Sequence, residues 1–512
     1  MTITPTLLLI LDGFGLAPAS PGNAIALAKT PNLDKLSATC AHTRLAASGR
    51  DVGLPAGYIG NSEVGHLNIG AGRVVYQDMT RIDVAVETGE LDRNAVFLQL
   101  LEDIQRKNGR LHLMGLLSDG GVHSHIGHVK ALARIAHARG VETLVHAFTD
   151  GRDVPPGSGG GYLADLRDTL KELGPCRIAS VCGRFYAMDR DKRWERVREA
   201  FAMLAHGKGR VADDAVSGFN AAYAAGESDE FIKPVLVRAL PGTSNTLCDN
   251  DGIFFFNFRA DRMREIVRAF LPDFAEFDRG VPPKLSGMAS MTAYDAGFAL
   301  PVAFPKEALR MGLGEVVSQM GKKQLRLAET EKYAHVTYFF NGGLEDPLPG
   351  EDRILVPSPR DVETYDLKPS MNAEEVTERF LEAWKSGVYS LVVCNLANPD
   401  MVGHTGVLSA AVAACETVDA CVGRMLEAVA ASGGRACITA DHGNAECMLD
   451  EHGAPHTAHT MNPTPCILVE PDGATPRLYE GRLADIAPTL LALWNVPQPP
   501  EMTGRPLTRE PT

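Results

Sequence analysis

The chain has 512 residues, 45% of them hydrophobic and 22% charged, a length and composition that predict a globular protein of two domains. Its formal net charge of -14 argues against general affinity for nucleic acid or for an anionic membrane, although a local arginine cluster could still hold a small anion. The ten cysteines form no CxxC pair, and the apolar run before Asp12 is too short for a secretory signal. We therefore expect reduced cysteines and a cytoplasmic protein.

The first predicted element is a buried strand over residues 6–11, which ends at Asp12. The next informative segment is residues 60–73, where Ser62 stands among glycines and other small residues. Because glycine adopts positive φ and permits close approach of a ligand, this segment predicts a sharp turn with an exposed serine hydroxyl. Ser62 is thus a candidate nucleophile; the commoner alternative is a turn serine that bonds to its own backbone.

The middle of the chain has apolar runs that end in turns rich in arginine. The runs cover residues 111–117, 143–148, 177–181 and 252–256, and the charged residues after them are His123, Arg152, Asp153, Arg184, Arg190, Arg259 and Arg262. Guanidinium groups bind phosphate and carboxylate through paired hydrogen bonds, so the arginines predict a site for a small acid, with Lys332 as a further charge. The alternative is solvated surface charge.

His123 and Asp153 are the candidates in this block for handling a proton or orienting a hydroxyl group. A residue in that role must reach the proton that it moves, and the sequence does not supply the distance. His125 and His128 lie nearby, and composition alone gives them an equal claim.

The last third of the chain carries a metal-type pattern. Strands over residues 390–394 and 436–439 run into acidic and imidazole side chains, namely Asp400, His404, Asp441 and His442, and a later loop adds His456 and His459. Mixed carboxylate and imidazole ligands suit Mn²⁺, Zn²⁺ or Fe²⁺ better than Ca²⁺. Spacing leaves open which of His456 and His459 is a ligand, and we expect His66 and His452 to be structural or surface histidines.

The order of these elements predicts the fold and the domains. Strands that alternate with helices indicate an α/β fold with a mostly parallel sheet, in which ligands bind beyond the carboxyl ends of the strands. The early and late metal-type residues flank the arginine block. We therefore predict a split metal-binding domain of residues 1–76 and 306–512, with a substrate domain of residues 77–305 inserted and hinges at the two connections.

Seven segments resemble the cofactor-independent phosphoglycerate mutase family, in family order and across nearly the whole chain. They are LILDGFG (9–15), GNSEVGHLNIGAGR (60–73), SDGGVHSH (118–125), DGRD (150–153), FRADR (258–262), DMVGHTG (400–406) and ADHGN (440–444). The resemblance implies a metal-binding domain like that of alkaline phosphatases with an inserted α/β substrate domain. It also implies an isomerase of glycolysis and gluconeogenesis that interconverts 3-phosphoglycerate and 2-phosphoglycerate without 2,3-bisphosphoglycerate.

The resemblance further implies roles for individual residues and two divalent metals, usually Mn²⁺, with Co²⁺ or Zn²⁺ as alternatives. Asp400, His404 and His459 would bind one metal, and Asp12, Ser62, Asp441 and His442 the other. Ser62 would be the phosphorylated nucleophile, and Asp153 is our candidate for moving the proton. The expected substrate contacts are His123, Arg152, Asp153, Arg184, Arg190, Arg259, Arg262 and Lys332.

Three alternatives stay open at this point. A metal-dependent phosphatase would share Asp12, Ser62 and Asp441 and would differ in admitting water. A phosphopentomutase would fit the metal motifs, although the arginine block suits a small acid better than a pentose. A non-catalytic metal-binding protein is the third. The resemblance also implies a monomer whose partner is a small phosphorylated acid, and the net charge predicts no nucleic-acid or membrane partner.

Overall fold

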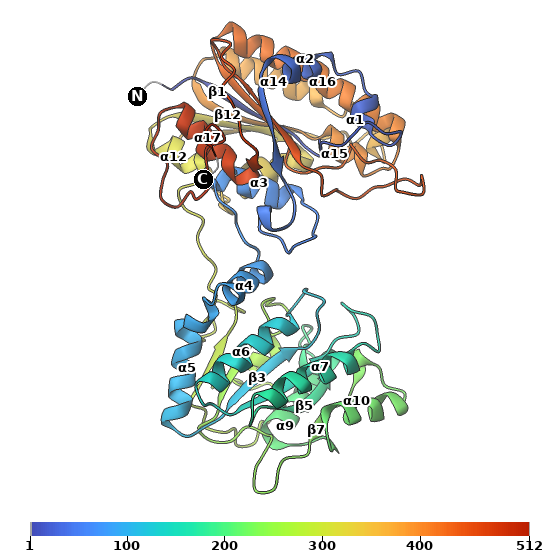
Figure 1. The fold of residues 1–512 in the computed structure, drawn as a ribbon, viewed down its shortest axis with the longest axis vertical. Helices are drawn as coiled ribbons and strands as arrows, with labels where there is room; N and C mark the ends of the chain where they lie inside the picture. The colour runs from blue at the N-terminus through green and yellow to red at the C-terminus, as the bar shows by residue number, and fades with distance from the viewer. Residues whose placement is uncertain (1–2, 511–512) are drawn as a thin grey trace. The chain divides into compact units, whose positions relative to one another are not determined.

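The computed structural model describes residues 3–510, and the chain divides into two compact units (Figure 1). Unit 1 comprises Met1–Gln77 and Ala308–Thr512, and unit 2 comprises Asp78–Glu307. Unit 2 is thus inserted, in sequence, between the two segments of unit 1. Each unit has its own sheet, with helices on both faces.

Unit 1 is built on an eight-stranded sheet. Its strands are β1 (Thr6–Leu11), β2 (Ala41–Ala46), β10 (Lys323–Glu329), β11 (Glu351–Val356), β12 (Tyr389–Leu396), β13 (Arg435–Thr439), β14 (Thr464–Val469) and β15 (Gly481–Arg482). The order is β11-β10-β12-β1-β13-β14-β2-β15. Neighbours from β11 to β13 are parallel, and β14 is antiparallel to both β13 and β2.

The helices of unit 1 cover both faces of this sheet (Figure 1). They are α1 (Ala24–Leu27), α2 (Pro31–Thr39), α3 (Ser62–Ala71), α12 (Leu313–Gln319), α13 (Thr330–Ala334), α14 (Ala373–Lys385), α15 (Asn398–Gly403), α16 (Leu408–Ala431) and α17 (Ile486–Leu493). Leu7 and Leu9 of β1 pack into a core with α14 and α16, whereas Leu8 and Ile10 pack into a second core with α3, α12 and α17. A central parallel strand buried on both faces needs such a continuous apolar run.

Unit 2 is built on a seven-stranded sheet in the order β6-β7-β5-β4-β3-β8-β9. Its strands are β3 (Leu111–Leu116), β4 (Thr143–Thr149), β5 (Arg177–Gly183), β6 (Arg210–Ala212), β7 (Val235–Val237), β8 (Gly252–Phe255) and β9 (Gly287–Ser290). Only the β5–β7 pair is antiparallel among the described pairs of this sheet. The predicted α/β class is therefore confirmed in both units.

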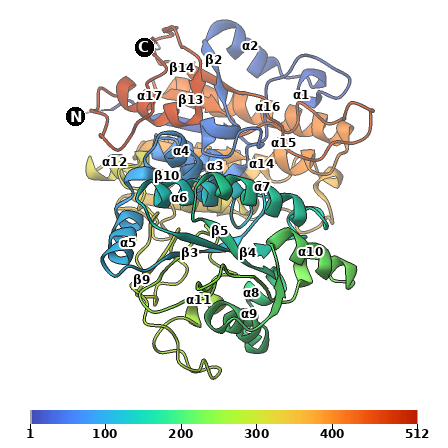
Figure 2. The ribbon, with the colours of Figure 1, turned by 60° about the horizontal axis from the view of Figure 1, so that its bottom comes forward.

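The helices of unit 2 also form two layers (Figure 2). They are α4 (Asp78–Glu87), α5 (Ala95–Arg106), α6 (Ile126–Ala138), α7 (Gly159–Glu172), α8 (Arg184–Ala187), α9 (Trp194–His206), α10 (Ala215–Ala224) and α11 (Arg264–Arg268). Phe254 of β8 packs on the side of α5, α6 and α7, and Phe255 packs on the side of α9 and α11.

A buried polar chain crosses the sheet of unit 2. His112 Nε2 lies 3.0 Å from Asp251 Oδ2, His112 Nδ1 lies 2.8 Å from His146 Nε2, and His146 Nδ1 lies 2.7 Å from Ser180 Oγ. One set of tautomers satisfies every contact: each imidazole donates through Nε2 toward Asp251 and accepts through Nδ1. Burial lowers the pKa of both histidines, so both are neutral at pH 7.

Short helical turns complete the fold: η1 (Gly49–Val52), η2 (Leu91–Arg93), η3 (Asp229–Phe231), η4 (His335–Phe339), η5 (Tyr365–Leu367) and η6 (Leu483–Asp485). All ten cysteines are free thiols. None of the helices in residues 3–510 combines the length and the apolar character that crossing a membrane requires.

Candidate functional site

The carboxyl ends of four neighbouring strands in unit 1, β10, β12, β1 and β13, carry charged side chains. Lys332 lies in α13 directly after β10, Asp400 lies in α15 after β12, and Asp12 follows β1. Asp441 and His442 come just after β13. Because parallel neighbours end at the same edge of a sheet, residues more than 400 positions apart in the sequence meet there.

Ser62 lies within this group, as the first residue of α3. Its Oγ lies 3.2 Å from Asp12 Oδ1, 2.9 Å from His442 Nε2 and 2.8 Å from Lys332 Nζ. Asn61 caps the helix by accepting a hydrogen bond from the Val64 amide. A helix N-terminus stabilises negative charge, so this position favours an oxyanion or a phosphate on Ser62.

The prediction of an exposed serine on a sharp turn is wrong in both respects. Residues 62–71 form a helix, and Ser62 is only 6% exposed. Gly65 does not have a positive φ; a Cβ atom there would lie 2.8 Å from the Asp441 Cβ. This glycine therefore serves close packing of α3 against the turn after β13, and turn and packing glycines look alike in a sequence.

Two sets of side chains in unit 1 have metal-ligand spacing. Asp400, His442 and His459 form one set, and Asp12, Asp441 and His442 form the other, with all ligand atoms of a set within 4.8 Å of one another. His442 belongs to both sets. The sequence-based pattern therefore does converge in space, although which atoms bind a metal stays a prediction.

The histidines near Asp400 have different hydrogen-bond partners in the structure. His459 Nε2 lies 3.1 Å from Asp400 Oδ1 and 3.0 Å from His404 Nε2. His404 Nε2 in turn lies 3.3 Å from Asp400 Oδ1. The Nδ1 of His456 instead lies 3.0 Å from the Cys447 carbonyl oxygen. Of the two histidines that spacing left open, His459 is the one beside the carboxylate.

His66 and Asn395 contact the residues around Ser62, although neither was predicted to belong to this site. His66 is fully buried, and its Nδ1 lies 2.9 Å from the Ser62 carbonyl oxygen and 3.3 Å from Asp441 Oδ2. Asn395, on β12, donates a hydrogen bond to Asp12 Oδ2 at 2.7 Å. Contacts of this kind orient metal-binding side chains. The sequence signal was a polar residue, Asn395, within the apolar run of residues 391–396.

The charges of this site suit divalent cations. Three buried carboxylates, those of Asp12, Asp400 and Asp441, face the single ammonium of Lys332, which lies 2.7 Å from Asp12 Oδ1 and 2.5 Å from Asp400 Oδ2. Three negative charges exceed the positive charge of Lys332 even when His442 is also protonated, so negative charge remains uncompensated. Asp441 Oδ2 also accepts no hydrogen bond from the described residues. Buried negative charge of this kind is costly unless a cation is bound, so the donor set fits divalent metals.

The same charges shift the protonation of their neighbours. Burial lowers the pKa of Lys332, but Asp12 and Asp400 outweigh that effect and hold its pKa well above its ordinary value. Burial likewise lowers the pKa of His442, and Asp441 together with Asp12 raises that pKa to about 9. A proton on His442 therefore competes with any metal that binds there.

Unit 2 repeats the arrangement with the opposite charge, at the carboxyl ends of the neighbouring strands β5, β4, β3 and β8. Arg184 directly follows β5, and His123 lies in the turn after β3. The turns after β4 and β8 supply the others: Arg152, Asp153, Arg259 and Arg262. Arg190 comes from the segment between α8 and α9.

Arg184 is the buried member of this arginine group, and carboxylates hold it in place. It is 1% exposed, and its Nη1 lies 2.5 Å from Asp150 Oδ1 and 2.7 Å from Asp153 Oδ2. A third carboxylate, Asp261, lies 3.2 Å from both Arg190 Nη1 and Arg259 Nε. Asp150 and Asp261 were missed as site residues, although both stand in the motifs DGRD and FRADR.

Positive charge converges in this group. Burial lowers the pKa of Arg262, and the nearby Arg184, Arg190 and Arg152 lower that pKa further. Burial and Arg184 also lower the pKa of His123 to about 4, so His123 is neutral at pH 7. Converging guanidinium groups beside a neutral imidazole can bind an acidic ligand and still offer an uncharged donor or acceptor.

Lys332 is not a member of this arginine group. The sequence placed it with the arginines, but it lies in unit 1, where its Nζ donates to Ser62 Oγ. Its role as a substrate contact stays a prediction. The structure shows that any such contact would be made from beside the serine.

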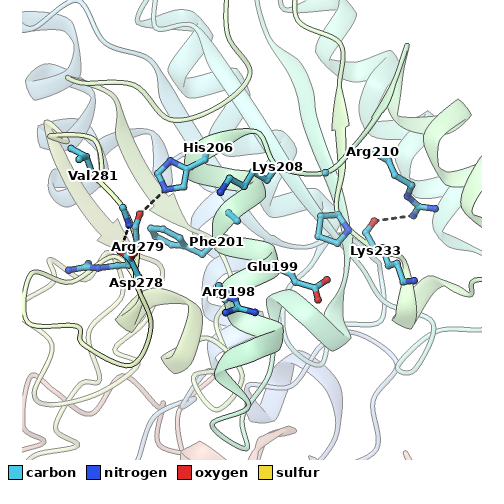
Figure 3. A pocket seen from close by; sticks show the side chains of 14 residues that line it. Arg198, Glu199, Phe201, His206, Lys208, Arg210, Lys233, Asp278, Arg279 and Val281 are labelled. Atoms are coloured by element: carbon cyan, nitrogen blue, oxygen red, sulfur yellow. Dashed lines mark hydrogen bonds between the residues drawn. The ribbon is translucent and has the colours of Figure 1, made fainter.

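A surface pocket of about 1060 Å³ in unit 2 contains none of the predicted site residues (Figure 3). Two of its arginines already have partners: Arg210 pairs with Glu227 at 2.7 Å, and Arg279 Nη1 donates to the Leu271 carbonyl oxygen. His206 Nε2 lies 2.7 Å from the Arg279 carbonyl oxygen (Figure 3). We therefore assign the functional chemistry to the strand ends and not to this pocket.

Comparisons with known proteins agree with this description. Residues 4–498 match the model of the Metalloenzyme superfamily. The chain is 60% identical over 511 residues to a 2,3-bisphosphoglycerate-independent phosphoglycerate mutase of Nitratidesulfovibrio vulgaris, covering 100% of both chains. It is 57% identical to a protein of the same name from Lawsonia intracellularis, covering 99% of both. A crystal structure of Leishmania mexicana phosphoglycerate mutase matches at 32% identity with a TM-score of 0.54, covering 99% of this chain and 98% of that one.

The fold and the donor sets define an α/β metalloenzyme. Since the similarity spans the whole of both chains, this chain belongs to the family of 2,3-bisphosphoglycerate-independent phosphoglycerate mutases, which are isomerases. The family predicted from the seven motifs is thereby confirmed.

Proposed function

We propose that the enzyme interconverts 3-phosphoglycerate and 2-phosphoglycerate through a phosphoserine at Ser62, in glycolysis and gluconeogenesis and without 2,3-bisphosphoglycerate. One observation carries the phosphoserine step: Ser62 Oγ, at a helix N-terminus, lies within 3.2 Å of Asp12, His442 and Lys332 atoms. A serine in this position can accept a phosphoryl group and hold its charge.

The residues that would hold two divalent metals are those that the family resemblance implies; the two donor sets contain all of them except His404 and Ser62, and His404 Nε2 lies 3.3 Å from Asp400 Oδ1. Asp400, His404 and His459 are proposed for one metal, and Asp12, Asp441 and His442, with Ser62, for the other. We propose Mn²⁺, because mixed oxygen and nitrogen ligands suit it, with Co²⁺ or Zn²⁺ as alternatives. When bound, such ions neutralise phosphate charge and lower the pKa of a nearby hydroxyl.

The protein's own side chains would carry the phosphoryl transfer. Ser62 Oγ attacks the phosphorus of 3-phosphoglycerate, a phosphorus–oxygen bond to the seryl oxygen forms, and the bond to the glycerate 3-oxygen breaks. The Ser62 hydroxyl proton passes to Asp12 Oδ1, 3.2 Å away, and returns when the phosphoserine is cleaved. Lys332 Nζ, 2.8 Å from Ser62 Oγ, stabilises the negative charge on the seryl oxygen. The released 3-oxygen takes up one proton and becomes a hydroxyl group.

The arginine group of unit 2 would retain the glycerate. Arg262, Arg190 and Arg152 bind its carboxylate and the departing charge, and buried Arg184 fixes the position of Asp153 through its 2.7 Å ion pair. Asp153 accepts the proton of the 2-hydroxyl and returns one to the 3-oxygen. The 2-oxygen then attacks the phosphoserine, which restores the free serine and yields 2-phosphoglycerate. Exclusion of water separates this mutase from a phosphatase.

The experiment is a mutase assay on metal-stripped enzyme reloaded with Mn²⁺, without 2,3-bisphosphoglycerate, followed by acid quench and mass spectrometry of Ser62. We expect 2-phosphoglycerate, little free phosphate and a phosphorylated Ser62 peptide. Ser62→Ala should remove turnover and label, whereas Ser37→Ala, at an exposed serine of α2, should keep both. Substantial turnover of Ser62→Ala with full metal occupancy would refute the relay, and free phosphate as the main product would indicate a phosphatase.

Two further expectations stay predictions. The resemblance implies a monomer, which sedimentation equilibrium tests. Cytoplasmic location is the second, and fractionation of the source cells tests it.

A further inference from the structure

Asp83, His125 and His128 form a cluster in unit 2 that the phosphoryl transfer does not use. Each offers one ligand atom, and these atoms all lie within 4.8 Å of one another. We infer that this cluster is a further metal site, which takes a zinc-class transition-metal ion independently of the metals proposed beside Ser62.

Two packed helices place the three side chains. Asp83 lies on α4, His125 caps the N-terminus of α6, and His128 lies in the first turn of α6. His128 is 1% exposed, and its Nε2 lies 2.7 Å from Asp83 Oδ1. His125 Nδ1 accepts a hydrogen bond from the Gly127 amide, which leaves Nε2 of that ring for a ligand.

The donor set selects the class of metal. Two imidazoles and one carboxylate are a ligand set typical of zinc, with the fourth position left to water. Mg²⁺ and Ca²⁺ prefer oxygen ligands only, so they fit poorly. In tetrahedral zinc sites the ligand atoms lie about 3.3 Å apart, so the 2.7 Å pair of Asp83 and His128 would open by about 0.6 Å on binding.

The surroundings leave the cluster able to bind a cation. Lys130 of α6 lies 2.6 Å from Asp165 and so does not neutralise Asp83 on α4. The Asp83 side chain is 22% exposed, which gives a metal and its water a route from solvent.

Metal binding here would fasten α4, the first helix of unit 2, to α6. The two helices lie next to each other (Figure 2), and the Asp83–His128 hydrogen bond already joins them. A metal would replace that single hydrogen bond by a three-ligand link. We therefore expect the ion to protect α4 from local opening and to take no part in the chemistry at Ser62.

Equilibrium dialysis of untagged full-length enzyme against buffered Zn²⁺, with zinc counted by mass spectrometry, tests the site. His125→Asn keeps a helix-capping oxygen but removes the imidazole. Asp83→Asn keeps a hydrogen-bonding partner for His128 but removes the carboxylate. Each variant should bind one equivalent fewer than the parent enzyme. His137→Asn, at an exposed histidine of α6, is the matched control and should bind as the parent does.

Retained mutase turnover with Mn²⁺ would show that the variants are folded. Anomalous diffraction at the zinc edge should place an ion between Asp83, His125 and His128. Zinc should slow hydrogen exchange of α4 in the parent and in His137→Asn, but not in His125→Asn or Asp83→Asn. If the parent and both variants bind the same number of equivalents, the cluster is a structural hydrogen bond and the site is refuted. Loss of the same equivalent in His137→Asn would equally refute it.

Discussion

The two units place charged side chains in the same way but with opposite sign. In unit 1 the carboxyl ends of four neighbouring strands gather the carboxylates of Asp12, Asp400 and Asp441. In unit 2 four neighbouring strands end in turns that gather arginines. The carboxylate side chains are at most 3% exposed, whereas those of Arg190 and Arg259 are 46% and 50% exposed.

The difference in burial between the carboxylates and the arginines indicates which kind of ligand each group binds. A buried carboxylate group is stable only with bound cations, so unit 1 suits ions that stay in place. Half-exposed arginines remain hydrated when empty and can exchange a small anion with solvent. Sheet topology sets where ligands bind, and the side chains of the turns set which ligands these are.

The largest expected effect is loss of metal from unit 1. Asp441→Asn removes a buried charge from the donor set, so we expect metal content to fall and turnover to drop by about 1000-fold or more. Metal analysis and steady-state assays measure both quantities. Asp346→Asn, at an exposed aspartate of the same unit, should change neither. An Asp441→Asn enzyme with full metal and normal rate would remove Asp441 from the site.

Replacing Lys332, in the same unit, should reduce turnover by a smaller factor. Lys332→Met removes the ammonium that donates to Ser62 Oγ, and we expect kcat to fall by about 100-fold. Metal content should not fall, because removing a positive charge from beside Asp12 and Asp400 does not weaken the binding of a cation there. Lys332→Arg should recover part of the rate. A change confined to KM would mean that Lys332 binds substrate without acting on the serine.

Unit 2 variants should separate substrate binding from metal binding. Arg262→Gln removes one of the converging guanidinium groups, so we expect kcat/KM to fall by about 10- to 100-fold, mainly through KM. Metal content should stay at the parent value. Loss of metal in this variant would contradict the division of roles between the two units.

The smallest expected effect concerns acid stability of unit 2. Burial lowers the pKa of His112 and His146 in the folded state, so below about pH 6.5 the unfolded chain binds protons that the folded chain does not. Stability should therefore fall as the pH drops, by at most about 2.7 kcal/mol per pH unit for two histidines. Asp251, whose pKa is lowered, adds a further loss only when the pH falls through its ordinary range near 4.

Hydrogen exchange of β3–β5 peptides between pH 5 and pH 7 measures this dependence. His146→Leu should reduce the slope by up to half, to about 1.4 kcal/mol per pH unit. His137→Asn should leave the slope unchanged, because His137 is exposed. An unchanged slope in His146→Leu would show that the buried chain does not control the acid response.

The sequence by itself determined the α/β class, the family and the residue types of each site. Continuous apolar runs such as residues 6–11 are buried strands because a parallel strand covered on both faces tolerates no polar side chain without a partner. The polar residues after those runs mark strand ends, where parallel sheets bind ligands. These rules are local, so they need no knowledge of which strands pair.

Only the tertiary structure decided which of these residues meet. Lys332 lies beside Ser62 because β10 is separated from β1 only by β12, an order that depends on contacts between distant segments. Similarly, His459 rather than His456 lies beside Asp400, although the two histidines share one loop. Ser62 is buried because α3 packs against the turn after β13 through Gly65. These contacts depend on strand order and close packing. The spacing of residues along the chain predicts neither the strand order nor the packing.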